Sequence, residues 1–261
     1  MIFKTRPGIN KQFEIAYDFG IKNLIVSGCS FTYNNHESAA TTWPYYLKDI
    51  GGFDHVLDCS MPGAGNYHIS NSLIWGLEND RPDPKNSLVI VMWSGNDRND
   101  FICPVSQDNG SYPFRFNYSE NTISGITGGS YRDDQGNTND LFRQFSLLKT
   151  SESRAIENYL QILNTWHYLK SSGFKFMFLE FLNSNLPSRT SHFDIKQYLP
   201  VNVGKKLHSM MENITDPYTW ALKNNLLTDD DFHPSPDGHL SWTKNVLFPH
   251  LSQRRFDFSQ T

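Results

Sequence analysis

Short apolar runs alternate with amphipathic stretches along the first third of the chain. Residues 23–26, 54–59 and 88–93 are rich in apolar and β-branched side chains and predict three strands. Residues 45–50 and 66–78 carry apolar side chains at helical spacing and predict two intervening helices. This alternation predicts an α/β fold, a three-layer α/β/α sandwich around a central, mostly parallel sheet.

An irregular stretch, residues 98–150, interrupts this rhythm. It combines scattered Gly, Asn, Asp and Ser with many aromatic residues and has no helical period until near its end. Residues 114–118 alternate like a short strand. We therefore predict an insertion, with a β-hairpin lying over the functional site, that selects the substrate or forms an interaction surface.

The alternation resumes after the insertion. Residues 151–172 predict a long helix that Gly173 ends, and residues 174–181 predict the next strand. We expect a polar loop over 182–203 and short helices within 204–225. A final helix is expected over 236–251, so residues 1–261 are interpreted as a single domain with one insertion.

Charge and cysteine content narrow the class of protein. The formal net charge is −4, which argues against a nucleic-acid-binding face. Aromatic residues make up 14% of the chain, which is ascribed first to a large core. The spacing of Cys29, Cys59 and Cys103 matches no metal site and favours free thiols. No secretory signal and no membrane-spanning run is visible, so we expect residence in the cytoplasm.

A serine follows the first predicted strand closely. Ser27-Gly28 breaks the apolar run, and Gly28 allows a tight turn that would leave Ser30 exposed at the carboxyl edge of the sheet. Open α/β sheets carry their reactive groups at this edge. The turn alone is weak evidence for a nucleophile, because small Gly/Ser turns follow many strands.

An acidic turn with a histidine lies near the other end of the chain. Asp230 precedes His233 by three residues, and two prolines stiffen the segment. A serine nucleophile needs a histidine base whose ring a carboxylate orients, and Asp230 or Asp231 could supply that carboxylate. Other interpretations are a solvated loop capping the last helix, or a cation site formed with Asp229, Asp231 and Asp237, which no second ligand cluster supports.

Four short motifs, taken in order, resemble those of the GDSL/SGNH hydrolase superfamily. They are Gly28-Cys29-Ser30-Phe31, Pro62-Gly63-Ala64-Gly65, Ser94-Gly95-Asn96-Asp97 and Asp230-Asp231-Phe232-His233. Each motif is weak alone, but each follows its expected element, and together they frame about residues 21 to 250. Two positions depart from the family pattern: Cys29 replaces the usual Asp, and Ser94 replaces a Gly.

The resemblance implies a flavodoxin-like fold and a serine esterase that needs no metal or cofactor. It implies a catalytic triad of Ser30, Asp230 and His233. The oxyanion hole would comprise the backbone N–H groups of Ser30 and Gly63 and the side-chain amide of Asn96. Substrate-binding roles are assigned to Asp97, Phe31 and Trp93.

Several of these residues also have structural interpretations. Asn96 and Asp97 could cap the turn that follows them. Gly63 and Gly65 could form a phosphate-binding turn, although the rest of a dinucleotide fingerprint is missing. His239 is interpreted as a helix residue near the site.

Two functions from different classes follow. The first is hydrolysis of an ester, such as an O-acetyl group on a carbohydrate or another small polar substrate. The second is a non-catalytic SGNH-like domain that binds a glycan or belongs to an assembly. Hydrogen-bond reach between Ser30 and His233 discriminates between them.

Overall fold

The architecture comes from a computed structural model, which describes residues 19–34, 41–95, 100, 115–118, 121–124, 149–180, 195–228 and 233–253. A parallel sheet forms its centre and has the strand order β2-β1-β3-β6. These strands are β1 (Asn23–Ser27), β2 (His55–Asp58), β3 (Ser87–Trp93) and β6 (Lys175–Glu180). The predicted α/β fold with a parallel sheet is confirmed.

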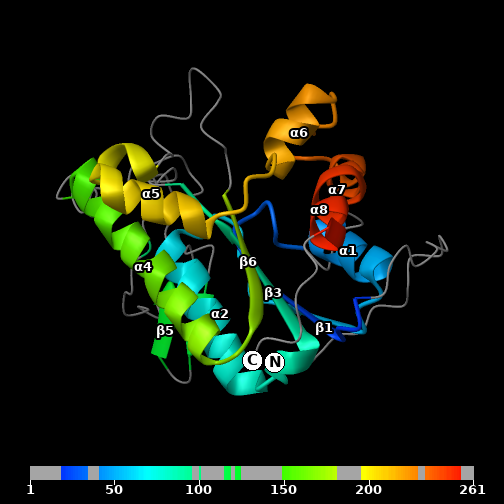
Figure 1. Ribbon diagram of the computed structural model, residues 1–261, viewed down its shortest axis with the longest axis horizontal. Helices are drawn as coiled ribbons and strands as arrows, with labels where there is room; N and C mark the ends of the chain where they lie inside the picture. Colours follow the sequence, from blue (N-terminus) through cyan, green and yellow to red (C-terminus); the bar gives the residue numbers. More distant parts are fainter. Residues whose placement is uncertain are drawn as a thin grey trace, which may run out of the picture.

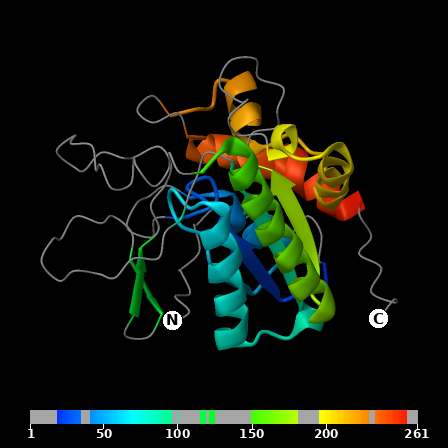
Figure 2. The ribbon, with the colours of Figure 1, turned by 90° about the vertical axis from the view of Figure 1, so that its left-hand side faces the viewer.

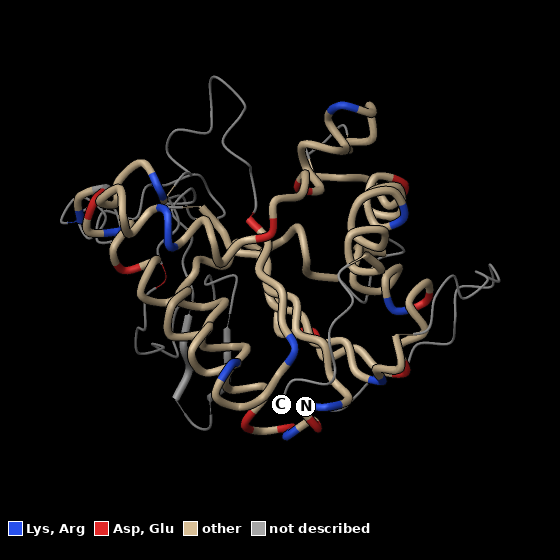
Figure 3. Tube along the Cα trace, viewed as in Figure 1, with Lys and Arg blue, Asp and Glu red and all other residues tan. Residues whose placement is uncertain are grey.

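The central strands owe their place to composition. Every residue of β3 is buried, and β1 is buried except at its first residue. Neither strand carries a charged side chain, whereas β6 places Lys175 and Glu180 at its two ends (Figure 3). Strands buried on both faces are apolar throughout instead of alternating, and this pattern is typical of parallel sheets.

Helices cover both faces of the sheet (Figure 1). Helices α2 (Asn66–Asp80) and α4 (Ser151–Ser171) pack together on one face. Helix α1 (Trp43–Gly51) lies on the other face with α7 (Pro236–Trp242) and α8 (Phe248–Gln253). Helices α5 (Val201–Met210) and α6 (Pro217–Lys223) complete the set and lie, with α7, toward the end to which the arrow of β6 points (Figure 2).

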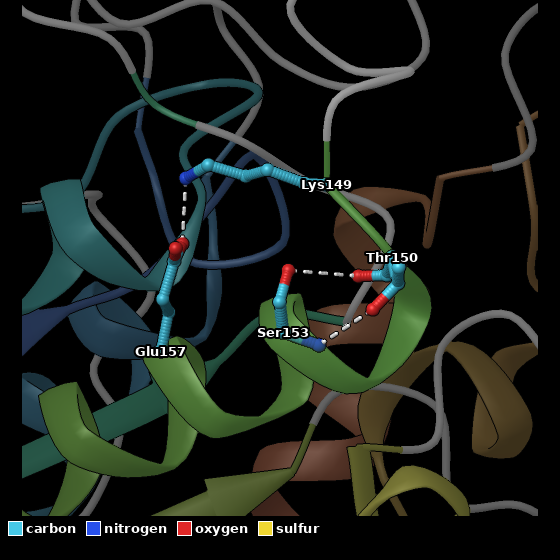
Figure 4. Close-up of polar contacts among 4 residues, drawn as sticks. All are labelled: Lys149, Thr150, Ser153 and Glu157. Carbon is cyan, nitrogen blue, oxygen red and sulfur yellow. Dashed lines mark hydrogen bonds and ion pairs between the residues drawn. The ribbon is translucent and has the colours of Figure 1, made fainter.

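Local side-chain chemistry sets the start of α4, the longest helix described (Figure 4). The Thr150 hydroxyl accepts a hydrogen bond from the Ser153 backbone N–H at 3.1 Å, and the Ser153 hydroxyl donates to the Thr150 carbonyl at 3.2 Å. Lys149 forms an ion pair with Glu157 at 2.6 Å. The cap occupies backbone groups that the first helical turn cannot pair internally.

Two helical predictions were wrong in detail. The expected loop over 182–203 contains a 3-10 turn at Ile195–Tyr198 and the first residues of α5; residues 181–194 lie outside the described chain. The expected continuous helix over 236–251 is interrupted by a π-helical turn at Thr243–Leu247. Pro249 has no N–H to donate, and the Phe248 N–H bonds five residues back to Thr243, which widens the turn before the proline.

Only part of the insertion is described. It contains an antiparallel pair, β4 (Arg115–Tyr118) and β5 (Asn121–Ser124), so the strand pairing of the expected hairpin is confirmed. The prediction that the insertion covers the site falls mostly outside the described residues, as does Cys103. Cys29 and Cys59 are buried free thiols. Within the ranges given above, no helix is long and apolar enough to cross a membrane.

Candidate active site

The strand order produces a topological switch point at one edge of the sheet. From β1 the chain proceeds to β2 on one side and later to β3 on the other, so the carboxyl ends of β1 and β3 form a topological switch point. Loops diverge at such a point and leave room for a ligand. Ser30 follows β1, and Ser94 follows β3 directly.

The nucleophile turn, residues Gly28 to Tyr33, is tightly packed. The backbone N–H groups of Thr32 and Tyr33 both donate to the Cys29 carbonyl at 2.9 Å. A Cβ atom on Gly28 would lie 2.3 Å from the Thr32 hydroxyl oxygen and 3.3 Å from the Met92 carbonyl oxygen. Only glycine allows this approach, and Ser30 remains partly exposed while its neighbours are buried.

The side chain of His233 lies next to that of Ser30, although the two residues are far apart in the sequence. Its Nε2 atom lies 2.8 Å from Ser30 Oγ, a hydrogen-bond distance between residues 203 positions apart. Its carbonyl accepts from the Thr228 backbone N–H at 2.8 Å and from the Thr228 hydroxyl at 3.1 Å. An antiparallel bridge between Leu227 and Pro234 closes this segment, which we call the histidine turn (residues 227–234).

Phe31 orients the imidazole. Its ring stacks on His233 with a centroid distance of 4.5 Å and an interplanar angle of 25°, and it meets Tyr218 edge to face. Only 5% of Phe31 is exposed, because one face lies against the histidine. This contact with the histidine differs from the expected substrate-binding role of Phe31, which stays a prediction.

Trp93 also differs from its expected role. It is 1% exposed and packs edge to face on Phe178 at the end of β3. An indole ring surrounded by core side chains presents no face to a substrate. We therefore assign Trp93 to the core.

Gly63 lies in a tight turn whose chain is bonded to the nucleophile turn. Its φ of 74° is in the left-handed region, and the Ala64 N–H donates to the Met61 carbonyl at 3.2 Å around this turn. The Met61 N–H in turn donates to the Gly28 carbonyl at 3.0 Å. This Met61–Gly28 bond joins the two loops. Gly63 lies two residues after Met61, and Ser30 lies two residues after Gly28.

Other residues predicted for the site fall outside the described chain. Asn96 and Asp97 follow the described Ser94-Gly95 pair, and Asp229, Asp230 and Asp231 precede the described His233. Their roles, including the choice between Asp230 and Asp231, stay predictions. Within the described portion, no group of three His, Cys, Asp or Glu side chains could hold a metal ion.

Burial changes the titration of two groups near the site. His239 on α7 is 4% exposed, and burial, reinforced by His233, lowers its pKa to about 3. This places His239 in a helix near the site, as expected, and keeps it neutral at pH 7. Asp58 lies half-buried at the end of β2, and desolvation of its carboxyl group raises its pKa to about 6 despite hydrogen bonds from Ser60 and the Asn34 backbone.

Two polar residues that sequence reasoning did not single out connect the loop after β3 to α2. The Asn66 side chain bonds both backbone groups of Ser94, and the Asp100 carboxylate accepts from two N–H groups at the start of α2. Asn66 comes directly after the glycine motif, and Asp100 lies three residues after Asp97. The available sequence signal for Asn66 and Asp100 was that each is a polar residue close to one of the motifs.

Comparisons with known proteins give a likeness of fold. No known protein family matches the sequence, and no curated protein matches it. The solved structure of protein YXIM from Bacillus subtilis is similar with a TM-score of 0.51 at 11% identity, covering 90% of this chain. This chain spans 58% of the length of that protein.

Other similar solved structures have lower scores. TesA has a TM-score of 0.48 at 15% identity, with 89% of this chain and 99% of TesA covered. A member of the lipolytic G-D-S-L family from Veillonella parvula has a TM-score of 0.42 at 13% identity, with 89% of this chain and 99% of that protein covered. At these identities the comparisons concern the fold, and the chemistry has to be argued from the site.

Proposed function

We propose that this chain is a serine esterase of the GDSL/SGNH type. One observation carries the proposal: Ser30 Oγ and His233 Nε2 lie 2.8 Å apart, although the residues are 203 positions apart in the sequence. A histidine nitrogen at this distance can accept the proton of the serine hydroxyl as the oxygen attacks. The motif resemblance independently names the same two residues.

The proposed reaction has two halves. Ser30 Oγ attacks the ester carbonyl while His233 takes its proton, and the histidine then gives that proton to the departing alcohol. Water, deprotonated by His233, next attacks the acyl-serine, and the acid leaves as the serine regains its proton. Asp230 would orient the imidazole and stabilise its charged form.

Three hydrogen-bond donors are proposed to stabilise the negative charge that develops on the carbonyl oxygen. They are the backbone N–H groups of Ser30 and Gly63 and the side-chain amide of Asn96. The left-handed turn at Gly63, joined to the nucleophile turn through the Met61–Gly28 bond, supports the second assignment. One such donor contributes about 2.7–4 kcal/mol to transition-state stabilisation.

The proposed substrate is an O-acyl ester, such as an O-acetyl group on a carbohydrate or another small polar molecule. The argument is compositional. The insertion over 98–150 is aromatic and polar, which suits stacking on sugar rings, and it contains no long apolar run for an acyl chain.

Release of p-nitrophenol from p-nitrophenyl acetate tests the reaction. We expect turnover by the wild type and none above background in Ser30→Ala, with unchanged circular dichroism. Ser209→Ala is the matched control, because Ser209 is exposed on α5 and bonds only locally to the Lys206 carbonyl. Acetylated sugars and longer acyl esters then identify the substrate.

A non-catalytic glycan-binding or assembly role is the alternative. Cys29 and Ser94 depart from the family motifs and favour it. Equal hydrolysis by wild type and Ser30→Ala on every ester tried would support this alternative, and glycan arrays would then be the next measurement.

A further inference from the structure

The first residue of α2 bonds to the loop that follows β3. Asn66 Nδ2 donates to the Ser94 carbonyl at 2.9 Å, and Asn66 Oδ1 accepts from the Ser94 backbone N–H at 2.7 Å. Both residues are buried and are 28 positions apart in the sequence. One amide side chain thereby pairs both backbone groups of Ser94, which a buried loop has to satisfy.

A second pair of hydrogen bonds joins the same two segments and involves Asp100, six residues after Ser94. The Asp100 carboxylate accepts from the Gly65 N–H at 2.9 Å and from the His68 N–H at 2.8 Å. The first turn of α2 cannot pair these N–H groups internally, and the helix dipole also favours a negative charge there. A Cβ on Gly65 would lie 2.6 Å from this carboxylate, so a larger residue there would displace Asp100 from its present position.

We propose that Asn66 and Asp100 are positioning residues that hold the two loops of the oxyanion hole at a set spacing. Gly63 precedes the anchored start of α2, and Asn96 lies in the sequence between the anchored Ser94 and Asp100. Each of the two bond pairs would therefore help to set the distance between the two proposed donors, Gly63 and Asn96. This inference rests on the proposed esterase function and adds residues that the family motifs do not name.

A positioning role predicts a specific kinetic signature. Donors aimed at the oxyanion act mainly in the transition state, so loosening them lowers kcat with little change in KM. Removing one donor outright costs about 100–1,000-fold in kcat. Displacing donors without removing them should cost less, about 10–100-fold.

The first test compares Asn66→Ala with Asn71→Ala on p-nitrophenyl acetate. Asn71 lies on the same helix and bonds only to the Tyr67 carbonyl one turn back. We expect kcat to fall about 10–100-fold in Asn66→Ala, with KM within about threefold, and no change in Asn71→Ala. Asn66→Asp keeps the acceptor for the Ser94 N–H and should fall between the two.

A second readout separates positioning from general loosening. Phenylboronic acid adds to a serine as a tetrahedral anion and so needs the oxyanion donors. Its inhibition constant should rise in Asn66→Ala by the same factor as kcat falls, while a planar product such as acetate binds unchanged. A structural defect alone would weaken both ligands or reduce the fraction of folded protein.

Asp100→Asn keeps the test decisive if Asn66→Ala does not fold. The asparagine retains one acceptor oxygen and loses the other, and we expect kcat to fall about 10-fold with KM unchanged. A folded Asp100→Asn or Asn66→Ala with kcat and boronate affinity within twofold of wild type would overturn the inference. Loss of Ser30-dependent turnover in the wild type itself would instead overturn the proposed function.

Discussion

Ser30 and His233 come from two turns that are held in different ways. The nucleophile turn is packed: Cys29, Phe31 and Thr32 are buried, and Gly28 leaves no room for a methyl group. Thr228 and His233 of the histidine turn are partly exposed, and bonds from Thr228 to the His233 carbonyl and the Leu227–Pro234 bridge help to hold them. Among the described residues, core packing thus surrounds one half of the candidate dyad, whereas backbone hydrogen bonds help to place the other.

Because of this difference, we expect substitutions in the two turns to affect stability and catalysis differently. Changes in the nucleophile turn should alter the free energy of unfolding as well as turnover, because they disturb core packing. Changes to the His233 side chain should alter turnover alone, because its backbone carbonyl carries the structural bonds. Three of the four predictions below test that separation, and the fourth, on Asp58, concerns stability alone.

The largest effect is expected for His233→Gln. Removing the base should lower kcat by at least about 10,000-fold. The midpoint of thermal unfolding should move by about 2 °C or less, since a partly exposed side chain is changed. Steady-state kinetics and calorimetry measure the two quantities. His208→Gln, exposed on α5, is the control, and a large loss of stability in His233→Gln would contradict the separation.

Asp58 should make stability depend on pH. Its pKa in the folded chain is raised to about 6 from an ordinary 3.8, so the folded state binds a proton more tightly than the unfolded state. The resulting stabilisation is complete below about pH 4 and is lost as pH rises through about 6, a change on the order of 2–3 kcal/mol.

Urea unfolding of Asp58→Asn measures this contribution. The variant should lack the decline in stability between about pH 4 and pH 7 that the wild type shows. Asp54→Asn, changed at an exposed position just before β2, should keep the decline. Parallel curves for wild type and Asp58→Asn would show that the carboxyl does not titrate as described.

Gly28→Ala should destabilise the fold by about 1–3 kcal/mol, because the added methyl group meets Thr32 and the Met92 carbonyl. Chemical denaturation measures the loss, and turnover should fall with it. Gly204→Ala is the matched control: its nearest contact would be 3.6 Å away, and alanine should stabilise α5 by about 0.5–1 kcal/mol. Equal stability of Gly28→Ala and wild type would disprove the tight packing of the turn.

Phe31→Leu should have the smallest effect. Stacking between aromatic rings contributes about 0.5–1.5 kcal/mol beyond buried area, so a loosely held imidazole should lower kcat by up to about tenfold. Kinetics of Phe176→Leu provide the comparison, since Phe176 meets Trp166 edge to face, lies tilted against Phe178 and packs on the core away from the dyad. If both variants keep full kcat, Phe31 does not orient His233.

The sheet could be predicted from sequence because its strands are apolar and local in pattern. Residues 88–93 form an uninterrupted apolar run, and β3 is buried throughout. The last helix could not be predicted in detail, because periodicity continues across Pro249 although its missing N–H changes the hydrogen bonding. The start of α5 was missed because residues 201–206 combine a glycine and two lysines without a clear apolar face.

The candidate site could be predicted in part for the same reason. Ser30 and His233 belong to short motifs, and the contact between them is confirmed. The roles of Phe31, Asn66 and Asp100 depend on contacts between loops far apart in sequence, which spacing does not reveal. For Phe31, the sequence has no local pattern that distinguishes an aromatic ring stacking on substrate from one stacking on histidine.

The bridge between Leu227 and Pro234 also bears on how this protein tolerates change. The bridge joins the two ends of the histidine turn. Next to it, the Ser235 N–H donates to the Leu226 carbonyl at 2.8 Å and joins the same two chain segments. His233 is therefore fixed from its carboxyl-terminal side as well, through the two residues that follow it in the chain. A substitution at Pro234 or Ser235 should accordingly reach the candidate dyad through the backbone, without any change to Ser30 or His233 themselves.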